Sequence, residues 1–191
     1  MIRKFDFLVV GSGIAGMSFA LKVADKGKVA ILCKSTLDEA NTALAQGGIS
    51  SVTNPVLDNY EKHIQDTLIA GDGMCDIKAV EKVVMNAPKQ IEQLLEWGVD
   101  FDKAPDGSFD LHREGGHSEH RILHHKDSTG AEIQRSLIKR IKQHKNIEVF
   151  VIDDGSTDNS GIIGCEFCKD NSNFFYHKKQ NEGTSSARNL G

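Results

Sequence analysis

Apolar runs alternate with helical periodicity in the first part of the chain. Phe5 to Val10 is apolar except at Asp6, and Val29 to Cys33 is a second apolar run. Short continuous runs bounded by glycines are typical of strands buried in a parallel sheet. The segment from Met17 to Ala24 predicts a helix that ends near Gly27. This strand–helix–strand order predicts an α/β fold.

Amphipathic spacing predicts further helices after residue 59. Apolar positions four apart predict one helix that ends at Gly71. Asp76 is placed to cap a second helix, and Pro88 suits the first turn of a third, which Gly98 would end. Asp106-Gly107 predicts a turn between two phenylalanines. The aliphatic positions of residues 133–141 predict one more helix, which leads into a strand at residue 147.

A glycine fingerprint joins the first predicted strand to the first helix. The run is Gly11-Ser12-Gly13-Ile14-Ala15-Gly16. In a dinucleotide-binding turn, one glycine makes the tight turn, one admits a pyrophosphate, and one lets the helix pack on the strand. The pyrophosphate then lies at a helix N-terminus, where free N–H groups favour anions. A plain glycine turn is the alternative. Lys34 stands where a ribose-binding carboxylate is expected, which disfavours NAD and leaves FAD open.

Three later segments resemble the L-aspartate oxidases of the succinate dehydrogenase and fumarate reductase flavoprotein family. They are Asn41 to Ile49, Asp66 to Gly73, and Arg113-Glu114-Gly115-Gly116-His117-Ser118, followed by Arg121-Ile122-Leu123-His124. The resemblance covers residues 5 to about 149. It implies a flavoprotein oxidoreductase that uses FAD to oxidise L-aspartate to iminoaspartate in NAD biosynthesis. Hydride would pass from the substrate α-carbon to the flavin.

The resemblance also implies roles for individual residues. Ser12 to Ala15 would lie on the pyrophosphate, with Lys34 near the adenosine half. Asn41 to Gly48 would wrap the flavin, and Glu114 would face the substrate amino group as the catalytic candidate. The implied cofactor residues are Gly11, Ser12, Gly13, Ile14, Ala15, Gly16, Lys34, Asn41, Thr42, Ala43, Leu44, Ala45, Gln46, Gly47 and Gly48. The family's capping domain and acid/base arginine lie beyond the matched part, so the 191-residue chain is expected to be inactive.

The tail from about residue 150 resembles a different family. Val151 to Ser160 contains Asp153-Asp154-Gly155-Ser156, which is similar to the nucleotide-sugar motif of inverting GT-A-fold glycosyltransferases. Asn181 to Gly191 is similar to a later motif of that family. By resemblance, Asp153 or Asp154 would hold the uracil or ribose. The alternative is an acidic turn that caps the next helix. No metal-binding Asp-x-Asp element or later general base follows, so glycosyl transfer is not expected.

The two resemblances predict a chimera with two parts. Residues 1–149 would be the N-terminal portion of an FAD-binding Rossmann-like (three-layer) domain. Residues 150–191 would be a βα fragment from a GT-A-like fold. Three hypotheses stay open at this point: an L-aspartate oxidase, a glycosyltransferase, or a non-catalytic chimera that at most binds a nucleotide.

Composition excludes some partners and changes little else. A net charge of −4 without a basic stripe disfavours nucleic acid, and the first apolar run is too short for a signal peptide or membrane span. Four cysteines without a framework favour a reducing cytoplasm, and Cys165-x-x-Cys168 predicts two thiols on one helix. The five histidines between positions 112 and 125 match no standard zinc spacing, so no metal site is predicted.

Overall fold

The computed structural model describes residues 3–34, 37–169 and 171–190. The chain divides into two compact units, residues 1–44 with 133–191, and residues 45–132. Helix α4 (Thr129–Lys142) crosses from the second unit into the first. Among the residues that the structure describes, no helix is long and apolar enough to cross a membrane.

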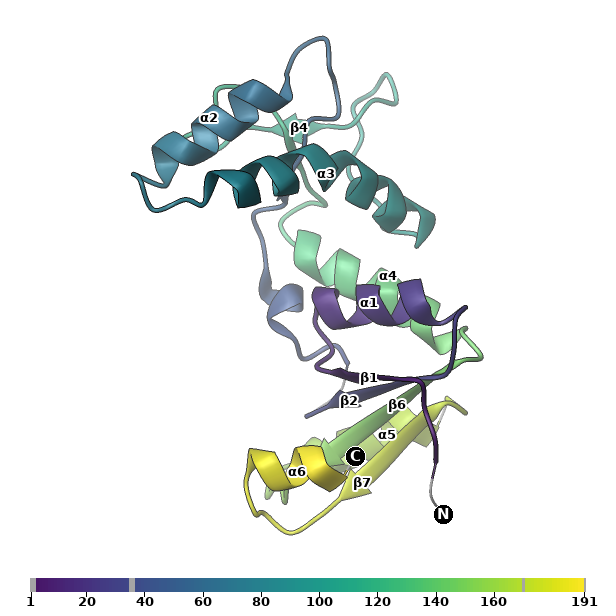
Figure 1. Ribbon diagram of the computed structural model, residues 1–191. Coiled ribbons are helices and arrows are strands. Elements are labelled where there is room, and N and C mark those ends of the chain that lie inside the picture. The colour runs from purple at the N-terminus through teal and green to yellow at the C-terminus, as the bar shows by residue number, and fades with distance from the viewer. Residues whose placement is uncertain (1–2, 35–36, 170, 191) are drawn as a thin grey trace. The chain divides into compact units, whose positions relative to one another are not determined.

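A four-stranded parallel sheet forms the centre of the first unit (Figure 1). Its order is β1-β2-β6-β7. The elements of this unit are β1 (Phe7–Val10), α1 (Ile14–Val23), β2 (Val29–Cys33), the 3-10 helix η1 (Asn41–Leu44), β6 (Ile147–Asp153), α5 (Ser160–Lys169), β7 (Phe174–Lys178) and α6 (Thr184–Leu190). The order β6-β2-β1 is the 3-2-1 half of a doubly wound sheet. Strand β7 then lies beyond β6, not beside β1, which departs from that order.

Helices cover the two faces of this sheet unequally. Helices α1 and α4 lie on one face (Figure 1), and α5 packs on the same face, since Gly164 lies against Val151. Helix α6 lies on the opposite face, where Ala187 packs on a buried cluster of Ala30, Leu32, Phe150 and Ile152. The strands β2 and β6 are therefore buried on both faces, as a central parallel strand requires.

The expectation that the first strand is buried is wrong. Strand β1 pairs only with β2 among the described strands, so it is an edge. Leu8 and Val10 are 61% and 57% exposed, because α1 covers the other side of the strand and no described helix covers theirs. The apolar run predicts the strand correctly, but hydrophobicity alone does not show which strand lies at the edge.

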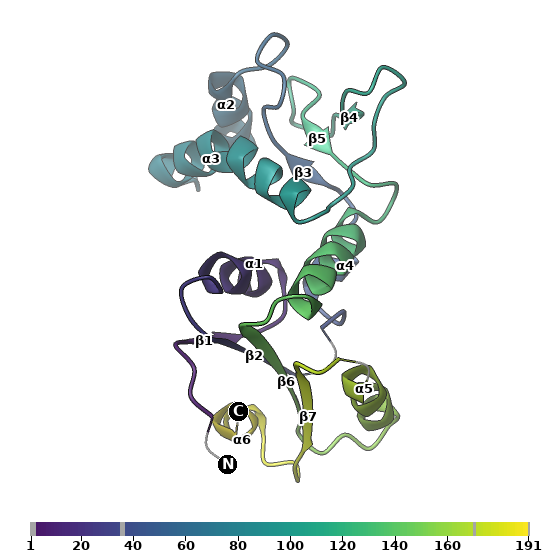
Figure 2. The same ribbon diagram turned by 90° about the vertical axis from the view of Figure 1, so that its right-hand side faces the viewer.

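The second unit combines two helices with a small antiparallel sheet (Figure 2). Its sheet has the order β3-β5-β4. The elements are β3 (Ile49–Ser50), α2 (Tyr60–Ala70), α3 (Ile77–Glu96), β4 (Leu111–His112) and β5 (Ile122–Leu123). Asn59 caps α2 and Asp76 caps α3, each by accepting a hydrogen bond from a backbone N–H in the first turn.

Pro88 does not begin a helix, contrary to the sequence prediction. It lies inside α3, which continues from Ile77 to Glu96. Proline removes one N–H donor and crowds the carbonyl four residues earlier, which normally disfavours a helix interior. Here Val84, Ile91 and Leu94 form one buried stripe across that position. Burial of this stripe holds the two predicted helices together as one. Gly98, with a φ of 92°, follows its end as expected.

The predicted boundary at residue 149 falls within β6. Strand β6 runs from Ile147 to Asp153 and pairs in register with β2 from Val29 to Cys33 and with β7 from Phe174 to Lys178. The strand continues across residue 149 without a break in pairing. The boundary between two parts of different origin therefore stays a prediction.

Candidate cofactor site

The turn between β1 and α1 is open where an anion would approach. Gly11 has a φ of 108°, a conformation that favours glycine, and no other atom lies within 4 Å of where its Cβ would stand. Gly13 is the N-cap of α1 in extended backbone. A Cβ on Gly16 would stand 2.3 Å from the Gly11 carbonyl oxygen, so this glycine allows the helix to meet the turn. The three glycines have the separate functions expected of a dinucleotide fingerprint.

Two of the predicted cofactor segments meet at the start of α1. The backbone N–H of Ile14 donates to Oγ1 of Thr42 over 3.0 Å, and a Cβ on Gly13 would lie 3.5 Å from the same oxygen. The helix η1 therefore lies against the glycine turn. Ser12 is buried, and its carbonyl accepts a hydrogen bond of 2.9 Å from Gln134. No acidic residue stands in the first turn of α1, so no carboxylate competes for its N-terminal donors.

A cavity of about 250 Å³ lies at the carboxyl ends of β1, β2 and β6. Open α/β sheets bind ligands at this edge. Lys34 is exposed at its rim, and Asp154 lines the same cavity. Cys33 belongs to the wall, where burial, with a smaller contribution from Cys168, raises the pKa of its thiol to about 12. The thiol is therefore protonated and acts as an apolar surface.

The remaining predicted residues belong to the second unit, and Gly47 and Glu114 meet there. A Cβ on Gly47 would stand 3.4 Å from Oε1 of Glu114. Gly48 has a φ of 99°, and a Cβ there would come within 2.5 Å of the Leu123 carbonyl oxygen. No other residue type fits that approach without displacing β5. Ala45 and Gln46 are exposed beside these glycines.

The turn that carries Glu114 is fixed by its own backbone. The N–H of His117 donates to the Glu114 carbonyl over 3.1 Å, and Gly116 has a φ of 90°. Nε2 of His117 lies 3.3 Å from Oγ of Ser50 at the end of β3. The Glu114 side chain is exposed. The turn thus presents an accessible carboxylate beside the glycines that precede β3.

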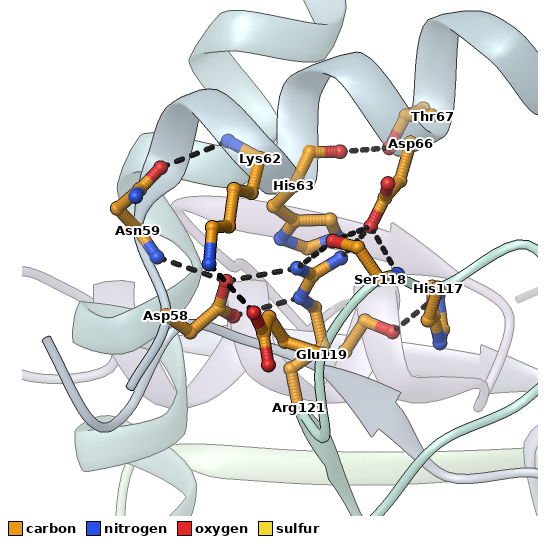
Figure 3. A network of polar contacts seen from close by, with 11 residues as sticks. Asp58, Asn59, Lys62, His63, Asp66, Thr67, His117, Ser118, Glu119 and Arg121 are labelled. Carbon is orange, nitrogen blue, oxygen red and sulfur yellow. Dashed lines mark hydrogen bonds and ion pairs between the residues drawn. The ribbon is translucent and has the colours of Figure 1, made fainter. Parts of the chain in front are cut away.

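A buried ionic network anchors this turn to α2 (Figure 3). Arg121 is fully buried and donates two hydrogen bonds of 2.8 Å to the carboxylate of Asp58. Its third nitrogen donates to Asp66 over 2.5 Å. Asp66 also accepts from the backbone N–H and the hydroxyl of Ser118, over 2.7 and 2.8 Å. One arginine therefore joins the segment before α2, the helix itself and the end of the Glu114 turn.

The network keeps its carboxylates ionised. Burial would raise the pKa of Asp66, but hydrogen bonds from Ser118 and Arg121 outweigh it and hold the pKa at about 2. Burial likewise opposes ionisation of Asp58, and the Arg121 guanidinium lowers the pKa of Asp58 below its ordinary value. The two carboxylates in turn raise the pKa of Arg121 despite its burial. Removal of one partner would leave an uncompensated buried charge.

Sequence reasoning missed the supporting residues of both regions. Arg121 and Asp66 lie within the segments that resemble the L-aspartate oxidases, but no role was predicted for them. Asp58, the partner of Arg121, has no distinguishing sequence feature except its place before a helix. Gln134 was also not predicted to belong to the site, although it donates to the carbonyl oxygens of Ser12 and Leu37. The sequence feature that could have indicated Gln134 is its place beside the apolar stripe of α4, because a buried side-chain amide needs a hydrogen-bond partner.

The tail motifs converge as well. A Cβ on Gly155 would stand 2.7 Å from the Asn181 backbone nitrogen, so the turns after β6 and β7 touch. Asp153 accepts hydrogen bonds from the Ser156 N–H over 2.7 Å and from the Tyr176 hydroxyl over 2.5 Å. Asp154 accepts from Lys179 over 2.9 Å. Both carboxylates therefore already have partners within the tail. The predicted helix after Ser160 is α5, and Cys165 and Cys168 on it are free thiols.

A family model described as an FAD binding domain matches residues 6–159. The chain belongs to the FAD binding domain family. The match to this FAD binding domain includes the glycine turn, η1 and the Glu114 turn, and it ends within the first residues of the tail. FAD is therefore the cofactor that family membership indicates.

Several curated proteins that are similar to this chain are named L-aspartate oxidase. The chain is 48% identical over 148 residues to L-aspartate oxidase 2-a, chloroplastic, of Nicotiana tabacum, covering 78% of the chain and 23% of the relative. It is 47% identical over 152 residues to L-aspartate oxidase of Vibrio cholerae, covering 77% of the chain and 28% of the relative. The chain thus spans about a quarter of the length of these relatives.

Solved structures show the same fold. The FrdA subunit of an Escherichia coli quinol fumarate reductase variant matches with a TM-score of 0.72 and 30% identity, over 79% of this chain and 28% of that chain. Mycobacterium smegmatis Sdh1 in complex with UQ1 matches with a TM-score of 0.71 and 30% identity, over 78% of this chain and 27% of that chain. The architecture is that of the succinate dehydrogenase and fumarate reductase flavoproteins.

The residues present fit FAD. The space above Gly11 is open, and the first turn of α1 offers backbone donors without an acidic neighbour. These features suit a pyrophosphate, whose charge the helix N-terminus favours. The cavity beside Lys34 lies where a nucleoside would continue from that turn.

Proposed function

We propose that the protein to which this chain belongs oxidises L-aspartate to iminoaspartate with FAD, as a step of NAD biosynthesis. The observation that carries the proposal is the proximity of Glu114 to Gly47 within the second unit, where a Cβ on Gly47 would stand 3.4 Å from Oε1 of Glu114. It joins the predicted substrate-facing carboxylate to the segment predicted to wrap the flavin. The names of the curated relatives favour the same activity.

The residues of the candidate cofactor site are proposed to hold different parts of FAD. The N-terminal donors of α1 and the open backbone at Gly11 hold the pyrophosphate, and Lys34 lies at the adenosine half. Gly47 leaves the backbone before β3 free of a side chain beside Glu114, where a planar ring system would fit, and Gly48 lets this backbone pack closely on β5. Bound FAD supplies a two-electron acceptor for hydride from the substrate α-carbon.

Glu114 would orient the substrate. Its carboxylate is exposed and accepts hydrogen bonds, which suits the ammonium group of an amino acid. Arg121, buried with Asp58 and Asp66, acts as a positioning residue because it holds Ser118 at the end of the Glu114 turn. Precise placement matters, since a misplacement of about 1 Å can cost roughly a hundredfold in rate.

A flavin titration tests the proposal on the 191-residue chain. We expect FAD to bind and to show the visible spectrum of a protein-bound flavin. L-Aspartate should then perturb that spectrum, and Glu114→Gln should weaken the apparent aspartate affinity by about tenfold or more, as loss of a charged hydrogen bond predicts. Glu81→Gln, at an exposed position on α3, is the matched control. A response to aspartate that is equal in both variants would contradict the assignment of Glu114.

Turnover is a separate question from binding. We expect the 191-residue polypeptide to produce no hydrogen peroxide or iminoaspartate from L-aspartate with added FAD. Among the residues given proposed roles, Glu114 alone is assigned to the substrate, and no acid or base is assigned beside it. Clear turnover by this polypeptide would show that the residues present suffice.

A second candidate concerns the tail, which we propose derives from a GT-A-fold glycosyltransferase. The contact between Gly155 and Asn181 favours it, because two motifs of that family then form one surface at the ends of β6 and β7. The hydrogen bonds already made by Asp153 and Asp154 disfavour a free ribose-binding carboxylate. Titration with UDP, followed through the amide signals of residues 153–158, tests whether the surface still binds a nucleotide. Unchanged signals would leave the tail as structure only.

A further inference from the structure

Three potential metal ligands converge on the β4–β5 ribbon. Strands β4 and β5 pair antiparallel, with Leu111 opposite Leu123 and His112 opposite Ile122. The same register sets Asp110 opposite His124, one position beyond the paired residues. Side chains two apart share a face of a strand, so Asp110, His112 and His124 lie on one face. One ligand atom from each lies within 4.8 Å of the other two.

His124 is the unusual member of this cluster. Its side chain is 7% exposed, and neither ring nitrogen has a hydrogen-bond partner. A buried polar group without a partner destabilises the fold, so an ion that binds the free nitrogen would offset that cost. The ring nitrogens face carboxylates on both sides. Nδ1 lies 3.4 Å from Asp102, and Nε2 lies 3.7 Å from Asp110.

The surroundings of His124 are similar to those of a metal-binding histidine. Such a histidine gives one nitrogen to the ion, and its other N–H faces a carboxylate that orients the ring. Asp102 stands in that second position, and its Oδ2 also accepts a hydrogen bond of 2.7 Å from the Lys126 backbone N–H, which fixes the carboxylate. Asp110 and His112 stand on the other side and are exposed. Nε2 of His124 is itself buried, and the exposed Asp110 and His112 form the solvent side of the cluster.

We propose that Asp110, His112 and His124 form a binding site for a divalent transition metal ion of the zinc type. Two imidazole nitrogens and one carboxylate oxygen are ligands that Zn²⁺ accepts, and a water molecule would take the fourth position. The rings of His112 and His124 are stacked with centroids 3.6 Å apart. Because a nitrogen lone pair lies in the ring plane, the exposed His112 ring turns when it binds. The ion would then fasten β4 to the segment after β5.

Spacing along the chain does not predict this site. His112 and His124 are separated by a loop that contains Glu114, and no zinc pattern has that interval. The antiparallel pairing of β4 with β5 brings His112 and His124 together, although they are far apart in the sequence. The site uses none of the residues assigned to FAD, so it is independent of the proposed oxidase function.

Zinc titration by calorimetry tests the proposal on the full 191-residue chain. The accessible thiols Cys75, Cys165 and Cys168 are first changed to serine, so that they do not bind the ion. We expect saturable 1:1 binding of Zn²⁺, and a loss of affinity of about tenfold or more in His112→Ala and in Asp110→Asn. Both side chains are exposed, so the fold should survive, and circular dichroism checks it.

His120→Ala is the matched control, because His120 is exposed in the same loop but outside the cluster. Its affinity for Zn²⁺ should equal that of the parent. The His124 ring protons should shift in NMR spectra on addition of zinc, which a surface histidine elsewhere would not cause. No saturable binding, or an equal loss in His112→Ala and His120→Ala, would overturn the proposal.

Discussion

Two strand-to-helix turns stand at the same end of one parallel sheet and have opposite character. Gly11 and Gly13 stand in the turn after β1 and Gly16 in the first turn of α1, where there is no carboxylate. The turn after β6 contains Asp153, Asp154 and Asp158. In the first turn, the open backbone leaves donors for an anion. In the second, carboxylates bind their own chain through Ser156 and Tyr176. Position at a sheet edge therefore does not make a nucleotide site, because free donors are also needed.

The largest effect is expected from filling the glycine turn. Gly13→Trp should abolish FAD binding, because the indole would occupy the place of the pyrophosphate, although a Cβ alone fits there at 3.5 Å from Thr42. The measurement is flavin content after reconstitution with FAD. Asn159→Trp places the same side chain at an exposed position after the acidic turn and should leave flavin content unchanged. Equal flavin in both variants would remove the distinction between the two turns.

The second expected effect compares two glycines of the fingerprint, Gly16, where a Cβ would clash, and Gly11, where it would meet no atom. Gly16→Ala should destabilise the fold by about 2–4 kcal/mol, because its Cβ would stand 2.3 Å from the Gly11 carbonyl oxygen. Gly11→Ala meets no atom and should cost about 1 kcal/mol for its positive φ. Urea unfolding of both variants gives the comparison. A larger cost at Gly11 would mean that backbone strain outweighs helix packing here.

Acid should weaken the second turn and spare the first. Burial raises the pKa of Asp153, but hydrogen bonds from Tyr176 and Ser156 lower it below its ordinary value of 3.8. A carboxyl group with a lowered pKa stabilises the fold above the unfolded pKa, and that stability is lost as pH falls through the folded pKa. Asp153→Asn should therefore flatten the loss of stability below about pH 3.8. An unchanged acid limb of the stability–pH curve would contradict this assignment.

The smallest expected effect connects the two turns. Asp154 lines the same cavity as Lys34, so its negative charge faces the approach to the glycine turn. Asp154→Asn should raise FAD affinity by about twofold at low salt, because it removes repulsion from the pyrophosphate, and salt should screen the difference. Lys34→Gln is the opposite change and should lower the affinity. If Asp154→Asn also lowers it, the Lys179 pair, not the field in the cavity, sets the affinity.

Local sequence patterns predicted the limits and caps of strands and helices better than they predicted how these elements pack. Strand β2 has the predicted limits, Val29 to Cys33, and Asp76 caps α3 as expected. Both depend on interactions within a few residues. The continuation of α3 through Pro88 and the exposure of β1 depend on tertiary packing, which periodicity does not contain.

The candidate site shows the same limit. The glycine turn was predictable, because a single turn carries its geometry. The Arg121 network and the histidine cluster were not, because each needs the pairing of segments far apart in the chain. The resemblance gave Gly47 and Glu114 separate roles and did not predict that they lie close together, since no local pattern relates two residues so widely separated.

The uncovered edge of the sheet has a consequence for handling the protein. Strand β1 presents one row of backbone donors and acceptors that no described strand pairs with, and Leu8 and Val10 beside it are exposed. Such an edge is a template for strand addition from another copy, and apolar side chains along it strengthen the attraction. Self-association at high concentration should therefore begin at the first strand of the chain. A lysine at position 8 would act as a gatekeeper against aggregation.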